Sequence, residues 1–329
     1  MANLLVPTTY ADIATAIGAA NNGDSVDLEE GLFQGANNRD QDSGGLDPIT
    51  FRGLGSDPSD VVIDCQTAGR AFSWSTNENN ITLENFTIIN GLPNNVGGAI
   101  EMTSVEVTAN HLVIHDCQGR DWGGAIFAGY ANNRLTMFNC LLYDNTVTLN
   151  TRSGGGAVSV YNAPNCTFDS CTLADNTAAG AGSQGGAVHL EGNAARAALT
   201  DCVVWGNTAV SGKQLYRNNG HTSAGAVDYC DYSNGVGDVA GTWTITNSIT
   251  TDPLFATGGH GDYYLSQIAA GQGADSGAVD TGSDTAANLG LETFTTRTDN
   301  VFDEGTADMG YHYSDAVPLS GAELLQMTP

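Results

Sequence analysis

One tetrapeptide recurs four times in this chain. Each copy reads Gly-Gly-Ala followed by Ile or Val, and the copies begin at Gly97, Gly123, Gly155 and Gly185, at intervals of 26, 32 and 30 residues. A repeat unit of this size is too small to bury its own apolar face, so successive units must stack on one another to form a continuous core. The repeat therefore predicts a solenoid.

Other positions recur in step with this motif. Phe86, Cys117, Cys140, Cys171 and Cys202 are expected to form one column of the stack, because they follow one another at intervals of 31, 23, 31 and 31 residues. The residues three and five positions before each of them are apolar or small. Alternating apolar positions are typical of strands. Each unit is thus expected to carry at least two short strands.

Three asparagines follow the same spacing. Asn145, Asn176 and Asn207 recur at steps of 31 residues. Asparagine supplies turns between strands, since its side chain tolerates left-handed backbone and bonds to its own main chain. The spacing predicts a ladder of buried amides that bond to one another along the stack.

The start of the chain has a helical pattern instead. Residues 9–12 read Thr-Tyr-Ala-Asp, which is typical of a helix start, and Ile13, Ala16, Ile17 and Ala20 then fall on one helical face. We expect this short helix to cover the first coil, whose open strand edges would otherwise pair with another chain.

The whole chain is expected to be a single domain with three parts. Residues 1–24 form the N-terminal cap and residues 25–235 the regular coils. Past Asp231 the repeat fades into long loops rich in Gly, Asp and Thr. Residues 236–329 are therefore expected to form distorted coils and a loop-rich C-terminal cap.

Four segments carry a resemblance to a known family. They read Asp-Cys-Val-Val-Trp-Gly-Asn-Thr-Ala at 201–209, Thr-Asp-Pro-Leu-Phe at 251–255, Gly-Asp-Tyr-Tyr-Leu at 261–265 and Ala-Asp-Met-Gly-Tyr-His-Tyr at 307–313. In these segments the chain resembles the choice-of-anchor Q group of right-handed parallel β-helix proteins, and its N-terminal half is similar to the entry of pectate-lyase-like β-helices. The resemblance implies an all-β fold, the right-handed parallel β-helix, and an extracellular setting.

Members of that group usually carry a signal peptide and often a C-terminal sorting anchor, and this chain shows neither pattern. Either a leader has been removed or the protein needs none. The second case points to a virion component, because phage structural proteins assemble in the cytoplasm and leave by lysis. The apolar residues 324–329 are expected to act as a docking tail in such an assembly.

The charge of the chain limits the kinds of partner that it can bind. It has 37 acidic residues against 10 basic ones, Lys213 is the single lysine, and the net charge is −27 at pH 7. Such a surface repels nucleic acid and anionic membranes, and no stretch approaches the roughly 20 apolar residues of a membrane span. We expect no nucleic-acid partner and no membrane span. Dense carboxylates suit calcium-rich water, which makes Ca²⁺ the candidate cofactor.

The seven cysteines are expected to be buried free thiols. An odd number cannot form a complete disulfide framework, and thiols fill space well in an inward column. The chain has no Cys-x-x-Cys pair or Cys/His cluster of the kind that holds a metal.

Because parallel β-helices commonly host polysaccharide lyases and glycosidases, an enzymatic site is a second expectation. A lyase needs a base and a cation or amide that neutralises the substrate carboxylate. Lys213 is the candidate base, with Arg217 and His221 nearby in sequence, unless it is an ordinary turn residue at an exposed corner. His189 is another candidate, since it points outward on a strand and can share a face with Glu101. A solvated strand histidine is the alternative.

Two carboxylates form a candidate metal site. Asp144 and Asp175 precede ladder asparagines and would lie stacked about 5 Å apart. Such a pair can share a calcium ion or raise one pKa, and the alternative is a pair of solvated turn carboxylates. A further candidate calcium region lies in the loops around Asp262, Asp275, Asp280 and Asp284.

Aromatic side chains on a rigid face can stack on sugar rings. Tyr143 and Trp205 are predicted at the same coil position, with Ala174 between them. Further outward candidates for glycan binding are Trp122, Tyr130 and Tyr216. Ordinary loop packing is the alternative for each of them.

These observations favour a non-catalytic structural protein of a virion or cell exterior, with a role in assembly, adhesion or glycan contact. Its expected partners are copies of itself, other surface or virion proteins, and polysaccharide. The alternative is a polysaccharide lyase or glycoside hydrolase that acts on an extracellular polysaccharide.

Overall fold

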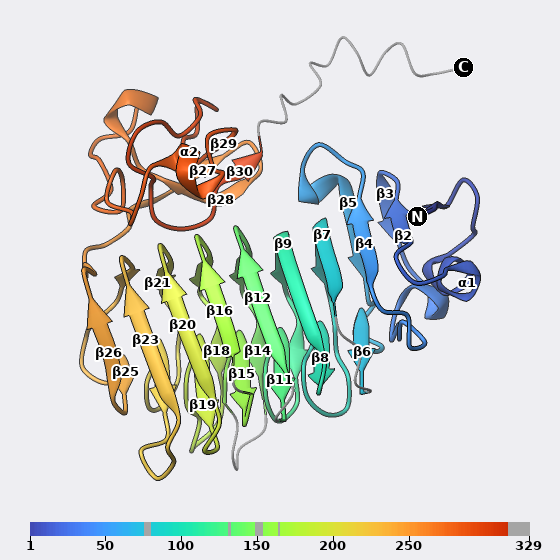
Figure 1. The fold of residues 1–329 in the computed structure, drawn as a ribbon. Coiled ribbons are helices and arrows are strands. Elements are labelled where there is room, and N and C mark those ends of the chain that lie inside the picture. Colours follow the sequence, from blue (N-terminus) through green and yellow to red (C-terminus); the bar gives the residue numbers. More distant parts are fainter. Residues whose placement is uncertain (76–79, 131–132, 149–153, 164, 315–329) are drawn as a thin grey trace.

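The computed structural model shows a parallel β-solenoid with a loop-rich segment packed on its side (Figure 1). The structure describes residues 1–75, 80–130, 133–148, 154–163 and 165–314. Strands of successive coils pair in parallel and in register, so the solenoid expected from the repeat is confirmed.

The largest sheet of the described residues contains sixteen strands in two rows, which β7 and β9 join because each spans both. The first row consists of β1 (Asn3–Val6), β2 (Ser25–Leu28), β4 (Ile49–Gly53), β7 (Ile81–Ile89), β9 (Glu106–His115), β12 (Arg134–Phe138), β16 (Asn165–Asp169), β20 (Arg196–Thr200), β23 (Ala224–Asp228) and β26 (Trp243–Thr246). The second row adds β3 (Gly31–Phe33), β5 (Val61–Asp64), β13 (Leu141–Tyr143), β17 (Thr172–Ala174), β21 (Val203–Trp205) and β24 (Asp231–Tyr232).

Two smaller sheets complete the coils. The seven-stranded sheet consists of β6 (Phe72–Trp74), β8 (Ile100–Thr103), β11 (Ile126–Gly129), β15 (Val158–Tyr161), β19 (Val188–Glu191), β22 (Leu215–Arg217) and β25 (Val239–Ala240). The three-stranded sheet consists of β10 (Gln118–Gly119), β14 (Thr146–Val147) and β18 (Thr177–Ala178). Short 3₁₀ helices occur at η1 (Ala36–Asn38), η2 (Pro58–Asp60) and η3 (Ile268–Ala270).

The Gly-Gly-Ala motif forms the corner between the two smaller sheets. Gly123 has a φ of +67°, and a Cβ on Gly124 would lie 1.9 Å from the carbonyl oxygen of Gly156 in the next coil. Glycine alone permits this backbone conformation without strain and this close approach. The motif therefore recurs because successive coils need the same corner.

The predicted asparagine ladder is confirmed. Asn176 is fully buried, and its Oδ1 accepts hydrogen bonds from the backbone N–H and the Nδ2 of Asn145, both at 3.0 Å. Its own N–H and Nδ2 donate to Asn207 Oδ1 at 2.9 and 3.0 Å. The ladder thus satisfies buried polar groups at one turn of successive coils.

The predicted cysteine column is wrong in one coil. Phe86 pairs in register with Leu112, whose N–H lies 3.5 Å from Cys140 Sγ, so Leu112 occupies the place assigned to Cys117. Cys117 lies instead at the end of the asparagine ladder, where its N–H donates to Asn145 Oδ1 at 3.1 Å. In this coil Leu112 stands where the other coils have a cysteine, and Cys117 follows it five residues later. The predicted column therefore took Cys117 in place of Leu112. The seven cysteines are buried and free, as predicted.

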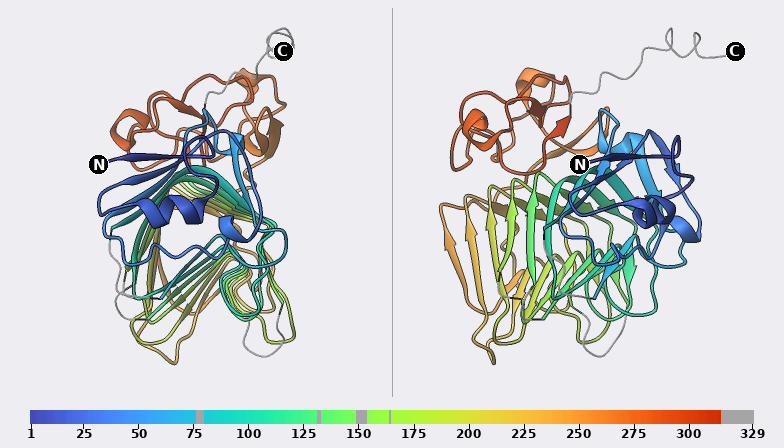
Figure 2. Two further views of the ribbon diagram at one scale, coloured as in Figure 1. Left: turned by 90° about the vertical axis from the view of Figure 1, so that its right-hand side faces the viewer. Right: turned by 45° about the vertical axis from the view of Figure 1, so that its right-hand side comes forward.

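Helix α1 (Ile13–Ala19) lies across the first coil, at the end that faces the viewer in the left panel of Figure 2. The N-cap is Asp12, whose Oδ1 accepts the N–H of Thr15 at 2.8 Å. The helix therefore starts later than the Thr-Tyr-Ala-Asp pattern suggested, because the N–H groups of Thr9 and Tyr10 bond to Leu5 in a preceding turn. Before that turn, β1 already belongs to the large sheet.

The segment after β26 turns back and packs along one side of the solenoid (Figures 1 and 2). We call residues 250–314 the flank segment. It contains the antiparallel pairs β27 (Phe255–Gly258) with β28 (Gly261–Leu265) and β29 (Phe294–Thr295) with β30 (Tyr313–Ser314), and helix α2 (Ala286–Leu289).

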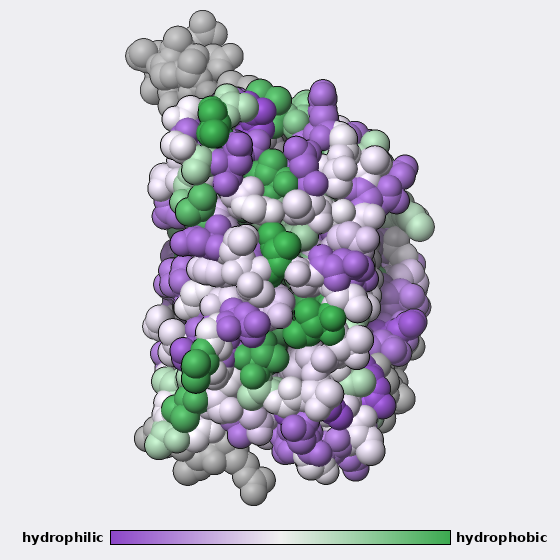
Figure 3. Space-filling model, turned by 90° about the vertical axis from the view of Figure 1, so that its left-hand side faces the viewer, coloured by the Kyte–Doolittle hydropathy of each residue, from purple (hydrophilic) through white to green (hydrophobic). Residues whose placement is uncertain are grey.

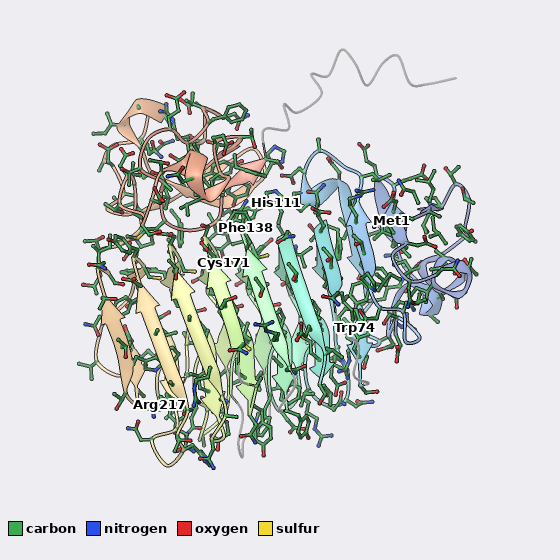
Figure 4. The ribbon with its side chains drawn as sticks, viewed as in Figure 1. Met1, Trp74, His111, Phe138, Cys171 and Arg217 are labelled. Atoms are coloured by element: carbon green, nitrogen blue, oxygen red, sulfur yellow. The ribbon has the colours of Figure 1, made fainter. Side chains whose placement is uncertain are left out.

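Hydrogen bonds anchor the flank segment to coils far apart in the sequence. Asn139 accepts from the His312 N–H at 2.7 Å and donates to the His312 carbonyl at 2.9 Å. The Ser283 hydroxyl donates to Asp201 at 2.5 Å, and the Ser314 hydroxyl donates to Asp57 at 2.6 Å. In Figure 4, His111 and Phe138 lie beneath this segment, and the rings of His111 and Phe294 are 4.8 Å apart.

The far end of the stack carries open strand edges. Among the described residues, β25 pairs with β22 alone and β26 with β23 alone. Val236, in the last coil, is 97% exposed and Ile245 is 36% exposed. Figure 3 views the molecule from this end and shows apolar patches among polar residues.

No helix in the described part of the chain is long and apolar enough to cross a membrane. This agrees with the absence of any long apolar stretch from the sequence. The predicted docking tail at residues 324–329 lies outside the described residues.

We expect Asn176→Ala to lower the free energy of unfolding by about 1–3 kcal/mol, because buried partners of the amide lose their hydrogen bonds. Denaturant unfolding followed by circular dichroism measures the change. Asn234→Ala, at an exposed asparagine, is the matched control and should leave stability unchanged. Equal stability of both variants would show that the ladder does not stabilise the stack.

Candidate functional site

The strands that follow the Gly-Gly-Ala motifs place one row of side chains on the outer face of the seven-stranded sheet. Pairing in register aligns Glu101, Phe127, Ser159, His189 and Tyr216 in successive coils. The residues on either side of the first four members point into the core, because strand side chains alternate. The row therefore lies outside the apolar core even where corner loops cover it.

A hollow of about 560 Å³ opens on this face, and we call it the sheet-face hollow. Tyr161 and Glu191 lie side by side in it, because they are register partners at the ends of β15 and β19. The described residues that line it are Trp122, Tyr161, Gln184, His189, Glu191, Asn218 and His221.

Aromatic rings form one wall of the hollow. The ring centroid of Trp122 lies 4.8 Å from that of Tyr161 and 6.4 Å from that of His189. Gly154 lies close against this wall, since a Cβ there would lie 2.4 Å from the His189 ring. Local packing thus holds the rings in fixed orientations.

Polar groups converge on Glu191. Its carboxylate accepts hydrogen bonds from Asn218 Nδ2 at 3.1 and 3.0 Å, and His221 Nε2 lies 3.0 Å from Oε1. The other ring nitrogen of His221 lies 3.2 Å from Asn193 Oδ1. These contacts fix the position of the carboxylate at the edge of the hollow.

His189 contributes a buried, neutral imidazole. Its Nδ1 lies 3.4 Å from Ser159 Oγ, and its ring stacks on Tyr216 with centroids 5.3 Å apart. Burial lowers the pKa of His189 to about 4, although the nearby Glu191 carboxylate opposes the shift. Nε2 has no hydrogen-bond partner among the described residues, and it lies 3.7 Å from Glu191 Oε2.

This arrangement suits the binding of a polar ligand that has flat apolar faces. Sugar rings stack on aromatic side chains, while amides, imidazoles and carboxylates bond to hydroxyl groups. A glycosidase of the usual kind needs two carboxyl groups, and Glu191 is the one carboxylate among the described lining residues. Lysine and arginine are absent from the described lining.

The structure brings together several residues that the sequence singled out. Trp122 and His189 line the hollow, and Tyr216 stacks behind His189 and accepts a hydrogen bond from Gln184 Nε2 at 2.8 Å. Tyr130 makes an edge contact with Tyr161, with centroids 5.7 Å apart. Glu101 shares the row but forms an ion pair with Arg70 and does not line the hollow.

The sequence did not single out Tyr161, Gln184, Glu191 or Asn218. Tyr161 and Glu191 carry a signal that could have found them, because both lie three residues after the Ile or Val column and so belong to the outer face. Gln184 and Asn218 also lie at repeated positions. Gln184 directly precedes a Gly-Gly-Ala motif, as Trp122 and Gly154 do in the neighbouring coils, and Asn218 lies three residues after Leu215, the register partner of Val188.

Lys213 and Arg217 lie apart from the hollow. The Lys213 ammonium forms an ion pair with Asp238 at 3.3 Å and its side chain is 44% exposed, as the corner prediction implied. Arg217, labelled in Figure 4, ends β22, and its Nε donates to the Ser223 carbonyl at 2.6 Å. Neither residue lines the hollow.

Tyr143 and Trp205 occupy the predicted position, with Ala174 between them in register. They lie against the flank segment and do not form a shared open platform. Tyr143 packs between His115 and Tyr263, with centroids 4.5 and 4.9 Å away. Trp205 packs against an apolar cluster of that segment.

Asp144 and Asp175 follow register partners, as predicted. The Tyr263 hydroxyl donates to Asp175 at 3.0 Å, while burial and then the neighbouring Asp175 raise the pKa of Asp144. Within the described ranges, no group of three or more metal-ligating side chains occurs. Calcium binding at this pair stays a prediction.

Comparison with known sequences places the chain in a family. The family described as "Right handed beta helix region" matches residues 62–228, half of the chain, so the protein belongs to the right-handed β-helix family. No curated protein matches it. The narrower choice-of-anchor Q group stays a prediction.

A solved structure similar to this chain is described as a mannuronic acid specific polysaccharide family 6 lyase enzyme from human gut microbiota. The two share 13% sequence identity, with a TM-score of 0.44. The alignment covers 75% of this chain and 59% of that chain, so this chain spans less than two thirds of the lyase.

We expect His189→Gln to remove part of the pH dependence of stability. The unfolded chain binds a proton at His189 below its ordinary pKa of 6.5, whereas the folded chain does so only near pH 4, so this stability is complete above pH 6.5 and is lost as the pH falls. As the pH falls from 6.5 to about 4, the free energy of unfolding of the wild type should decrease by about 3 kcal/mol more than that of the variant.

Denaturant unfolding of both proteins at several pH values measures this difference. The comparison with the variant is needed because burial also raises the pKa of Asp169 to about 6 and that of Asp231 to about 7. These two shifts increase the free energy of unfolding as the pH falls, and they do so equally in both proteins. If the free energies of unfolding of the wild type and of His189→Gln changed with pH in the same way, His189 would not be protected from protonation.

Proposed function

We propose that this protein is a non-catalytic surface β-helix that binds glycans in the sheet-face hollow. The observation that carries the proposal is the wall of Trp122 and Tyr161 beside the polar group of Glu191, Asn218 and His221. Aromatic faces and hydrogen-bonding groups at the same site are what a sugar requires. The rigid stack of coils holds them in place without a ligand.

The charges of the hollow favour neutral over acidic glycans. Glu191 lies in it, and lysine and arginine are absent from its described lining. Because the pKa of His189 is lowered to about 4, its imidazole is neutral at ordinary pH. An anionic sugar would therefore meet the Glu191 carboxylate, with no lysine or arginine among the described lining residues to compensate it.

We expect Trp122→Ala to weaken glycan binding by about tenfold, through loss of one stacking face. A glycan array identifies the ligand, and calorimetry with the best neutral glycan measures the affinity. Phe302→Ala is the control, because Phe302 is an exposed aromatic residue of the flank segment. Binding that Trp122→Ala leaves unchanged, or an array without any neutral ligand, would contradict the proposal.

One observation favours a polysaccharide lyase as a second candidate. The Nε2 atom of His189 is buried, neutral and without a hydrogen bond among the described residues, which a general base requires. If His189 is a base, the protein should release unsaturated uronates from an acidic polysaccharide, which are detected by their absorbance. His189→Gln should abolish this release, and Lys213→Ala should not. Cleavage by the wild type would overturn the non-catalytic proposal.

We further propose an extracellular, cell-surface or virion location, in which the protein assembles with its own copies or with other surface proteins. The acidic surface, with 37 acidic and 10 basic residues, supports the location. The open edges of β25 and β26 support assembly, since unpaired strands recruit further strands.

We expect native mass measured by light scattering in calcium-containing buffer to exceed that of one chain. Substituting Ile245 by Asp should return the mass to that of a monomer, because a charge on an edge strand opposes pairing. A monomeric wild type would contradict assembly through this end.

A further inference from the structure

A second cavity lies between the solenoid and the flank segment. It has a volume of about 200 Å³, smaller than the roughly 300 Å³ at which sites for drug-sized ligands begin. Its floor is aliphatic and comes from neighbouring coils, with Val62, Ile89, Val113 and Leu141. It lies on the large sheet and is separate from the sheet-face hollow. We call it the flank cavity.

Aromatic rings from both parts of the molecule surround the flank cavity. The solenoid contributes Tyr143, and the flank segment contributes Tyr263, Tyr311 and Tyr313. The Tyr311 and Tyr313 rings meet edge to face, with centroids 4.8 Å apart, and Tyr143 lies 4.9 Å from Tyr263. Rings at several angles around a small space attract a cation through their electron-rich faces.

The aspartates give the described lining of the flank cavity a negative charge. Asp57 and Asp262 line it, and lysine and arginine are absent from its described lining. The carboxylates of Asp116, Asp144 and Asp262 lie close enough to help burial raise the pKa of Tyr143 to about 12. The two histidines of the lining each face a carboxylate: His115 lies 2.7 Å from Asp116, and His260 lies 3.6 Å from Asp57.

The lining also distinguishes this cavity from a sugar site. It contains no asparagine or glutamine among the described residues, whereas the sheet-face hollow has Gln184 and Asn218. A neutral sugar would find few amide partners here, and an acidic sugar would meet carboxylates. A methylated ammonium group fits both the apolar floor and the acidic rim.

We propose that the flank cavity binds a small organic cation with a quaternary ammonium head. The methyl groups contact the aliphatic floor, the tyrosine faces surround the positive charge, and the carboxylate of Asp262, which is exposed, attracts it from the rim. Because its walls come from the solenoid and the flank segment, a bound cation also links these two parts.

Choline titrated into the full chain, followed by calorimetry, tests the proposal. The neutral isostere 3,3-dimethylbutan-1-ol has the same shape without the charge. We expect choline to bind at least about tenfold more tightly than the isostere, since the cation–aromatic attraction is lost in the latter. Added salt should weaken choline binding and leave the isostere unaffected.

Two variants locate the site. Asp262→Asn should weaken choline binding several-fold while the protein stays folded, because Asp262 is exposed. Tyr143→Leu should abolish binding, whereas Tyr143→Phe, which keeps the ring, should retain it. Trp122→Ala, in the sheet-face hollow, should have no effect.

Equal affinity for choline and its isostere would overturn the proposal, as would the absence of choline binding to the wild type. Choline binding that Asp262→Asn and Tyr143→Leu leave unchanged would also overturn it. Failure of glycan binding would not affect this outcome, since the two sites share no lining residue.

Discussion

Parallel hydrogen bonding between successive coils is the interaction on which the rest of the structure depends. It fixes the register, and the register decides which side chains become neighbours. The same pairing stacks Asn145 on Asn176 inside the corner and places His189 beside Tyr216 outside the sheet. A slip of one residue would exchange inward and outward positions. The glycine corners matter for the same reason, because they let neighbouring coils come close enough to pair.

One stack presents two surfaces of different chemistry. On the seven-stranded sheet, corner loops leave a hollow in which amides and a neutral imidazole accompany aromatic rings. On the flank, a segment of loops covers the large sheet and leaves a small cavity with tyrosines and carboxylates. The difference arises from what covers each sheet. The backbone of Gly154 lies against His189 because Gly154 has no side chain, whereas tyrosines of the flank segment pack against Tyr143 and Leu141.

Repeated features could be predicted from the sequence, and single features could not. The asparagine ladder and the glycine corners follow from recurring spacing, and the outward positions of His189 and Tyr216 follow from strand alternation. Cys117 was assigned to the cysteine column because it lies only five residues after Leu112, which occupies that column position in its coil. The packing of Tyr311 against the solenoid joins residues more than a hundred positions apart, which no local pattern encodes.

The anchors of the flank segment have a consequence for how such a chain can change in length. Solenoids commonly gain or lose coils, since each coil contacts only its neighbours. Here Ser314 is bonded to Asp57 and Ser283 to Asp201, so a single segment spans the coils between them. An inserted coil would move these two anchor points apart by about 4.8 Å. The flank segment therefore limits the number of coils that can lie between its anchors.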